Sequence, residues 1–159
     1  MTTPEELALR QGLQVCLVHG EALQDALYDI AKRRFIADDL QELTKQDRRL
    51  LDQFAYRYTR LQDDLGARVM PAALKALGEE VATMPAIDRF NRLEQIGWLS
   101  SAEEWLELRQ IRNQFAHEYP ETPDQRFERF QAAARAAQRL LAILREITAK
   151  IEHRFPNPP

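Results

Sequence analysis

The sequence of 159 residues contains one cysteine and five glycines. A single cysteine excludes an internal disulfide and cannot form a metal cluster alone. Because Cys16 lies in an apolar stretch, we expect a small buried residue rather than a reactive thiol. Few glycines, and the lack of runs in which Val, Ile and Thr alternate with polar residues, argue against strands. These absences predict a chain made of helices joined by short links.

Long hydrophobic runs are also missing, since no segment approaches the ~18 apolar residues needed to span a bilayer. At the N-terminus, Glu5 and Glu6 place acid where a signal peptide carries base. The sequence therefore predicts a cytoplasmic protein with no membrane contact.

A strong positive charge is absent as well, because the formal net charge is -3. This argues against a protein that coats nucleic acid with its whole surface. The charge is uneven, however. The segment 109–154 carries nine lysines and arginines against six acidic residues, which gives it +3 and leaves -6 for the remainder. Any polyanion is expected to meet the C-terminal part first.

What the sequence does contain is a series of amphipathic helical patterns. They predict one all-α domain over residues 1–159, folded as an antiparallel four- to five-helix up-and-down bundle. Trp98 and Trp105 are expected to anchor the core or a dimer interface. The expected helices begin at Thr3, Thr44, Pro85, Ser101 and Thr122, and capping boxes are expected at Ser101 and Thr122. We also expect a short connection over 35–43, helix breaks at Gly66 and Pro71, and a frayed tail over 156–159.

The segment Arg112 to Tyr119 ends one of these helices and holds the best candidates for chemistry. Asn113 and His117 are four residues apart and share a polar face, with Arg112 within reach. Arginine matches phosphate oxygens and histidine exchanges protons near neutral pH, so together they could cleave RNA without a metal. The alternative is structural. His117 could simply complement the helix dipole, and Arg112 could pair with Glu118 or another surface acid.

Arg112-Asn113-Gln114-Phe115-Ala116-His117-Glu118-Tyr119 resembles the signature of the HEPN superfamily, Arg-x4-6-His with a polar residue after the arginine. Arg112-x4-His117-x-Tyr119 is similar, more narrowly, to the HepT toxin branch. The resemblance implies a homodimeric helical bundle with its motifs in a shared cleft. It also implies a metal-independent endoribonuclease that acts on tRNA or mRNA, with Arg112 and His117 catalytic, Asn113 in support and no cofactor.

The same resemblance implies a partner, a minimal nucleotidyltransferase that acts as antitoxin by attaching AMP to Tyr119. The added charge and bulk would exclude RNA from a phosphate-binding cleft. Two other functions stay open. Related HEPN proteins are non-catalytic nucleotide- or substrate-binding companions of nucleotidyltransferases, and the motif could also be accidental in a plain interaction bundle.

Arg109, Arg126 and Arg129 are possible RNA-binding residues, and Arg126 and Arg129, three apart on the last expected helix, could line a groove for RNA phosphates. An ordinary solvated helix face is the alternative. Tyr56 and Tyr58 could stack on bases, but neither has a neighbouring basic cluster strong enough to favour this role. His19, His117 and His153 lack the spacing of metal ligands, so no metal site is predicted.

Overall fold

Helices account for the regular structure of the computed structural model, which describes residues 2–117 and 121–157. No strand occurs in these two ranges, and none of their helices combines the length and apolar character needed to cross a membrane. In chain order the elements are α1 (Pro4–Arg33), the 3₁₀ turn η1 (Ala37–Leu40), α2 (Lys45–Asp64), the π turn η2 (Leu65–Val69), α3 (Met70–Ala76), α4 (Ala86–Gln95), α5 (Ala102–Ala116) and α6 (Pro123–Arg154).

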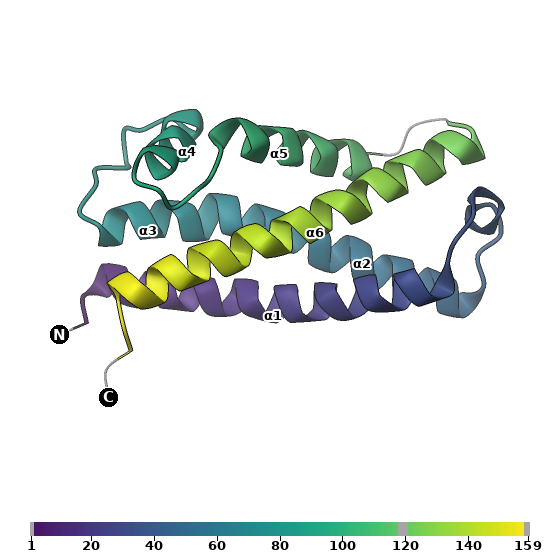
Figure 1. Ribbon diagram of the computed structural model, residues 1–159, viewed down its shortest axis with the longest axis horizontal. Helices are drawn as coiled ribbons and strands as arrows, with labels where there is room; N and C mark the ends of the chain where they lie inside the picture. Colours follow the sequence, from purple (N-terminus) through teal and green to yellow (C-terminus); the bar gives the residue numbers. More distant parts are fainter. Residues whose placement is uncertain (1, 118–120, 158–159) are drawn as a thin grey trace.

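The long helices run up and down along one common direction (Figure 1). α1 is antiparallel to α2 and α3, and α5 is antiparallel to α6, while the short α4 covers one end. α1 packs against α2, α3 and α6, and α5 packs against α6 and, less extensively, α2. The predicted all-α antiparallel bundle is therefore confirmed.

Polar side chains cap the starts of α1, α2, α5 and α6 where the sequence placed them. Thr3 Oγ1 accepts a hydrogen bond from the Glu6 amide at 3.1 Å, and Thr122 and Gln125 form the predicted reciprocal capping box. At Ser101 only half of the predicted box forms. Ser101 Oγ accepts from the Glu104 amide at 3.0 Å, but the Glu104 carboxylate binds Arg139 at 2.9 Å instead.

The breaks expected at Gly66 and Pro71 do not occur, because α2, η2 and α3 form one continuous helical rod. Pro71 has no amide hydrogen for an α-helical bond to the carbonyl four residues earlier. The chain absorbs it with a wider turn, in which the Met70 amide reaches back five residues to the Leu65 carbonyl. Gly66 lies against Trp105, and a Cβ there would come within 2.9 Å of the indole ring. Its role is close packing rather than helix termination.

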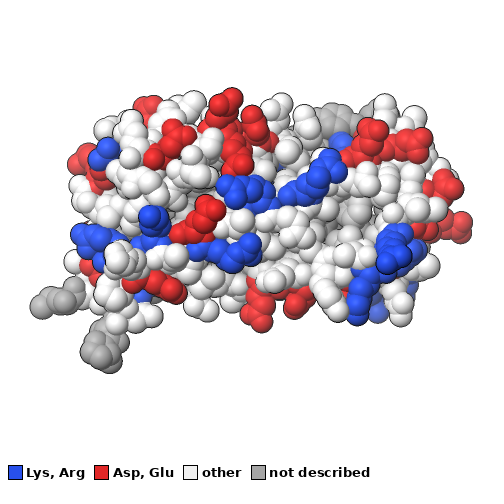
Figure 2. Space-filling model, viewed as in Figure 1, with Lys and Arg blue, Asp and Glu red and all other residues white. Residues whose placement is uncertain are grey.

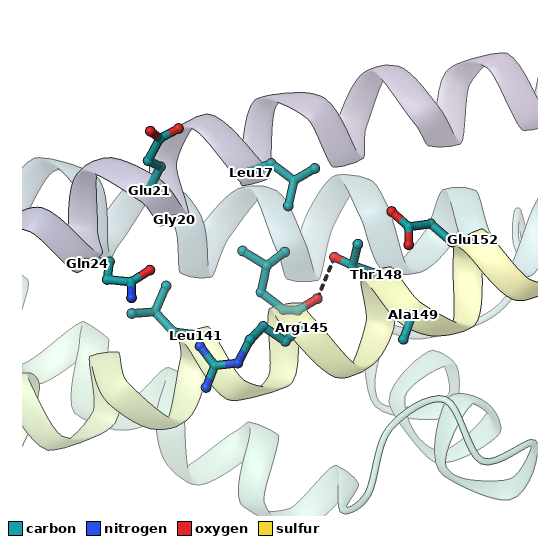
Figure 3. Close-up of a pocket in the computed structure, with 10 residues that line it drawn as sticks. Leu17, Gly20, Glu21, Gln24, Leu141, Arg145, Thr148, Ala149 and Glu152 are labelled. Carbon is teal, nitrogen blue, oxygen red and sulfur yellow. Dashed lines mark hydrogen bonds between the residues drawn. The ribbon is translucent and has the colours of Figure 1, made fainter. Parts of the chain in front are cut away.

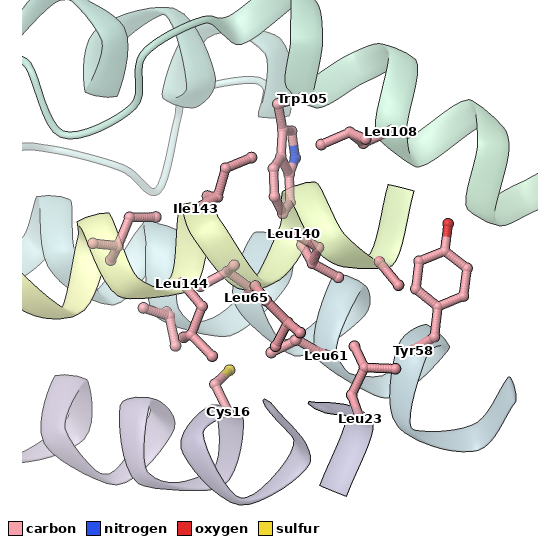
Figure 4. Close-up of a cluster of buried hydrophobic side chains, with 14 of the residues drawn as sticks. Cys16, Leu23, Tyr58, Leu61, Leu65, Trp105, Leu108, Leu140, Ile143 and Leu144 are labelled. Atoms are coloured by element: carbon pink, nitrogen blue, oxygen red, sulfur yellow. The ribbon is translucent and has the colours of Figure 1, made fainter. Parts of the chain in front are cut away.

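The core is a single apolar cluster that joins the four long elements (Figure 4). Trp105 and Tyr58 are fully buried in it, and Trp98 is buried at its edge, so both tryptophans anchor the core. Cys16 is buried as expected, and burial raises the pKa of its thiol to about 12. Figure 4 shows side chains from α1, α2 with η2, α5 and α6 converging: Cys16, Leu23, Tyr58, Leu61, Leu65, Trp105, Leu108, Leu140, Ile143 and Leu144.

Two further contacts hold α1 against α6. Gly20 lets the helices approach so closely that a Cβ would lie 2.7 Å from a methyl group of Leu144. Near the chain ends, the Arg10 guanidinium donates to the Phe155 carbonyl and to Asn157 Oδ1, and the Phe155 ring is buried. The described part of the expected frayed tail is thus bound to α1.

Candidate functional site

The predicted motif lies at the C-terminal end of α5, which stops at Ala116. His117 caps the helix with an extended backbone, φ -88° and ψ 140°, so the helical conformation ends at this residue. The helix is therefore a little shorter than the sequence indicated. Tyr119, the predicted AMPylation residue, lies outside the described residues, as do its neighbours 118 and 120.

Arg129 of α6 holds this helix end in place. Its Nη1 donates to the carbonyls of Gln114, at 2.6 Å, and His117, at 3.0 Å, and its Nη2 pairs with the Glu121 carboxylate. The last carbonyls of a helix lack intrahelical partners and carry partial negative charge, so a guanidinium suits them. Arg129, predicted as an RNA contact, thus has a structural role that the sequence did not indicate.

His117 borders an open hollow of about 670 Å³ between α2, the end of α5 and the start of α6. Tyr56 is 55% exposed on one wall, on α2. Arg126 lies on another wall, where its Nη1 makes a long 3.4 Å hydrogen bond to the Leu40 carbonyl. A histidine, an exposed tyrosine and two arginines therefore line the same hollow. Its lining residues are Ala55, Tyr56, Thr59, Phe115, Ala116, His117, Glu121, Arg126 and Arg129.

Arg112 and Asn113 are not among the residues that line this hollow. The Arg112 side chain, 22% exposed, donates from Nη2 to Asp63 Oδ2 on α2 at 2.6 Å. This is the acid pairing that the structural alternative allowed, with Asp63 as the partner. Within one chain, the structure does not bring the functional groups of Arg112 and Asn113 together with His117 in the hollow.

Arg109 lies apart from the hollow as well. Its guanidinium is stacked over the Phe90 ring at 5.6 Å, beside a small cavity of about 160 Å³ between α4, α5 and the η2 region. The three possible RNA-binding arginines therefore do not form one group, because Arg109 lies at this small cavity whereas Arg126 and Arg129 line the hollow. Of the two arginines that line the hollow with His117, Arg126 has fewer described contacts than Arg129.

The two tyrosines considered for base stacking, Tyr56 and Tyr58, differ in exposure and contacts. Tyr58 is buried, stacks on Phe54 at 5.6 Å and meets Phe115 edge to face. Burial raises the pKa of its hydroxyl, against a smaller opposing effect of Arg112. Tyr56 has its ring at the surface, approached by the guanidinium of Arg57 at 5.4 Å. Only Tyr56 can meet a ligand.

A buried histidine between α1 and α2 is a feature that sequence reasoning missed. His19 Nδ1 lies 3.0 Å from Arg57 Nη1, and since arginine can only donate, Nδ1 accepts and the proton is on Nε2. Nε2 faces Asp64 Oδ2 at 3.5 Å. Burial, assisted by Arg57, lowers the pKa of His19, so the neutral ring is favoured. No spacing in the sequence links residues so far apart.

A second hollow, of about 350 Å³, lies between α1 and α6 (Figure 3). Its apolar walls come from Leu17, Leu141 and the small Gly20. The Thr148 hydroxyl donates a 2.6 Å hydrogen bond to the Leu144 carbonyl. Glu21, Arg145 and Glu152 surround it with mixed charge. None of the predicted site residues lies here.

On the face shown in Figure 2, basic groups follow a band across the middle of the molecule, and acidic groups lie beside and within this band, so the positive surface is interrupted. Arg139, for example, binds Glu104 and Glu146. Among the described residues, no three His, Cys, Asp or Glu side chains are arranged to hold a metal ion. The hollow beside His117 is therefore the best candidate site.

Comparison of the chain with models of known protein families, with curated proteins and with solved structures finds no match in any of the three.

Proposed function

We propose that the protein is a metal-independent endoribonuclease that cuts single-stranded RNA. The observation that carries this proposal is the open hollow beside His117, where an imidazole lies with the guanidinium of Arg126 and the exposed ring of Tyr56. A proton carrier, a phosphate-binding cation and a base-stacking surface are the groups that cleavage of single-stranded RNA requires.

In the proposed reaction His117 takes the proton of the 2'-hydroxyl, whose oxygen attacks the adjacent phosphorus. The bond to the 5'-oxygen breaks, that oxygen receives a proton, and a 2',3'-cyclic phosphate remains. Arg112 stabilises the charge on the phosphate oxygens, and Asn113 orients them or the imidazole. In one chain Arg112 is paired with Asp63, so it must exchange this carboxylate for the phosphate.

A homodimer is part of this proposal. One histidine cannot conveniently act as both base and acid, and the hollow of one chain lacks Arg112. A second copy facing the first would supply another His117 and Arg112.

A minimal nucleotidyltransferase is the proposed antitoxin, adding AMP to Tyr119, two positions after His117. This part follows from the sequence resemblance, and a mass increase on Tyr119 after incubation with ATP and such a transferase tests it.

One observation favours a second candidate, a non-catalytic nucleotide-binding companion of a nucleotidyltransferase. The 2.6 Å pair between Arg112 and Asp63 engages the guanidinium that catalysis would need. A binding module needs only the hollow and Arg126. This candidate predicts nucleotide or transferase binding that survives loss of Arg112 and His117.

Cleavage of labelled single-stranded RNA in EDTA separates the two candidates. We expect His117→Ala and Arg112→Ala each to slow cleavage at least about 100-fold. Arg135→Ala is the matched control, since Arg135 is exposed on α6 away from the hollow, and it should cleave normally. Equal cleavage by all three variants would remove the ribonuclease proposal. Absence of cleavage by the wild type, with binding retained, would support the companion role.

A further inference from the structure

The hollow beside His117 has two walls of different chemistry. Tyr56 on α2 offers an aromatic face, and Arg126 on α6 offers planar N–H donors. These residues are 70 positions apart in the sequence, so the sequence alone could not show that they line the same hollow. Folding supplies the basic partner that the sequence could not show.

The two arginines of the hollow are not equivalent. Arg129 binds two main-chain carbonyls and the Glu121 carboxylate, so it supports the end of α5. Arg126 has a single long hydrogen bond among the contacts of the described residues, to the Leu40 carbonyl at 3.4 Å. A phosphate would replace such a weak bond readily, because charge-assisted hydrogen bonds are shorter and stronger.

Tyr56 is suited to stacking rather than to core packing. Its side chain is 55% exposed, and its described ring contacts are an edge contact with His19, at 6.0 Å between centroids, and the Arg57 guanidinium. The adjacent guanidinium adds positive charge beside the ring, which favours a nucleotide over an uncharged aromatic ligand. The hollow, at about 670 Å³, is large enough for one nucleotide unit.

We propose that Tyr56 and Arg126 form a nucleotide subsite for single-stranded RNA, in which the base stacks on Tyr56 and its phosphate binds Arg126, beside His117. This inference rests on the proposed ribonuclease function and adds a specificity-determining residue to it. Stacking does not require a particular base, so the subsite selects unpaired strands rather than a sequence.

Binding of a fluorescent single-stranded RNA to the His117→Ala protein tests the subsite without cleavage. Loss of one stacked base should weaken binding roughly five- to 150-fold in Tyr56→Ala, while Tyr56→Phe should stay within about two-fold. Arg126→Gln should weaken binding and reduce the slope of log affinity against log salt by about 0.7. Tyr28→Ala is the control, because Tyr28 is also an exposed helical tyrosine beside a cation, Lys32, but lies on α1.

An abasic oligomer with the same number of phosphates isolates the base contact. Tyr56→Ala should not change its affinity, whereas Arg126→Gln should. An equal loss for the abasic oligomer, or an unchanged affinity of Tyr56→Ala for RNA, would overturn the subsite. Thermal unfolding of each variant shows that it folds, which the exposure of Tyr56 makes the expected result.

These results are separable from those for the proposed function. If wild-type protein cleaves RNA but Tyr56→Ala binds and cleaves normally, the subsite is wrong and the ribonuclease proposal stands. If wild-type protein never cleaves but single strands bind through Tyr56, catalysis is wrong and the subsite stands.

Discussion

Two negatively charged groups compete for Arg112: the Asp63 carboxylate in the folded chain and, in the proposed reaction, a phosphate of RNA. The Asp63 side chain is 49% exposed, and ion pairs in such positions contribute at most about 1 kcal/mol. The pair is therefore weak enough for a phosphate to replace it.

Replacing Asp63 with Asn should strengthen RNA binding about two- to five-fold at low salt, since it removes a competing charge worth up to about 1 kcal/mol. Fluorescence anisotropy with single-stranded RNA measures this effect, and Asp52→Asn, on an exposed site of the same helix, is the control. Weaker binding by Asp63→Asn would show that Asp63 positions Arg112 instead of competing for it.

His19 makes stability depend on pH. Its folded pKa lies below the ordinary value of 6.5, so the unfolded chain binds a proton first as pH falls. The contribution of His19 to the free energy of unfolding is therefore complete above about pH 6.5 and is lost as pH falls towards the pKa of His19 in the folded protein. Arg57 and Arg60 oppose protonation and Asp64 favours it, with burial the largest influence.

We therefore expect wild-type protein to lose more thermal stability between about pH 7.5 and 5 than His19→Gln does. Melting curves at a series of pH values give the comparison. Asp47 has a lowered pKa through its bond to Arg33, but it is present in both proteins and cancels. Parallel pH profiles for the two proteins would contradict the assignment of a neutral His19.

At the scale of elements, Arg129 joins the start of α6 to the end of α5, where the motif lies. Arg129→Gln removes this bond set and leaves the Glu121 carboxylate, 9% exposed, without its guanidinium. We expect a loss of roughly 1–3 kcal/mol in the free energy of unfolding. Urea unfolding measures it, with Arg135→Gln as the exposed control on the same helix. A loss no larger than the control's would remove the supporting role of Arg129.

Gly66 sets the distance between η2 and α5. A methyl group there would lie 2.9 Å from the Trp105 ring, which is fully buried and cannot move aside easily. Gly66→Ala should cost about 1–3 kcal/mol. Gly12→Ala is the matched control, because its Cβ would make ordinary 3.4 Å contacts and the helix gains from losing glycine. Equal stability of the two variants in urea would contradict this tight contact.

The sequence predicted these elements unevenly, for a physical reason. Caps such as Thr3 and Thr122 act within three residues, so a local pattern is sufficient. Gly66 and Pro71 were misread because local rules treat them as helix breakers, whereas packing on Trp105 and a wide turn keep the rod intact.

The site was predicted only in part, for a related reason. The sequence placed Arg112, Asn113 and His117 at the end of a helix, where they are. It could not assign their partners, since Asp63 is 49 residues from Arg112 and Tyr56 approaches His117 only through folding. Long-range partners of this kind depend on how helices pack, which a single sequence does not state.

For the whole molecule, one core joins every long helix, and Trp98 and Trp105 are both part of it. A domain of this size with a single core should unfold in one cooperative step. Tryptophan fluorescence and far-UV circular dichroism should then give the same midpoint in urea. Midpoints that differ would mean that the α4–α5 region, which carries the tryptophans, opens separately from the rest.

The π turn over Leu65–Val69 also fixes the rotational phase of everything after it. Each residue of an α-helix advances the side chains by about 100°. After the extra residue in this turn, Met70, Ala73 and Leu74 are buried, and the helix that carries them packs against α1. Deleting one residue here would restore a regular α-helical turn but destabilise the fold, since the apolar side chains in the last turns of the rod would then point towards water.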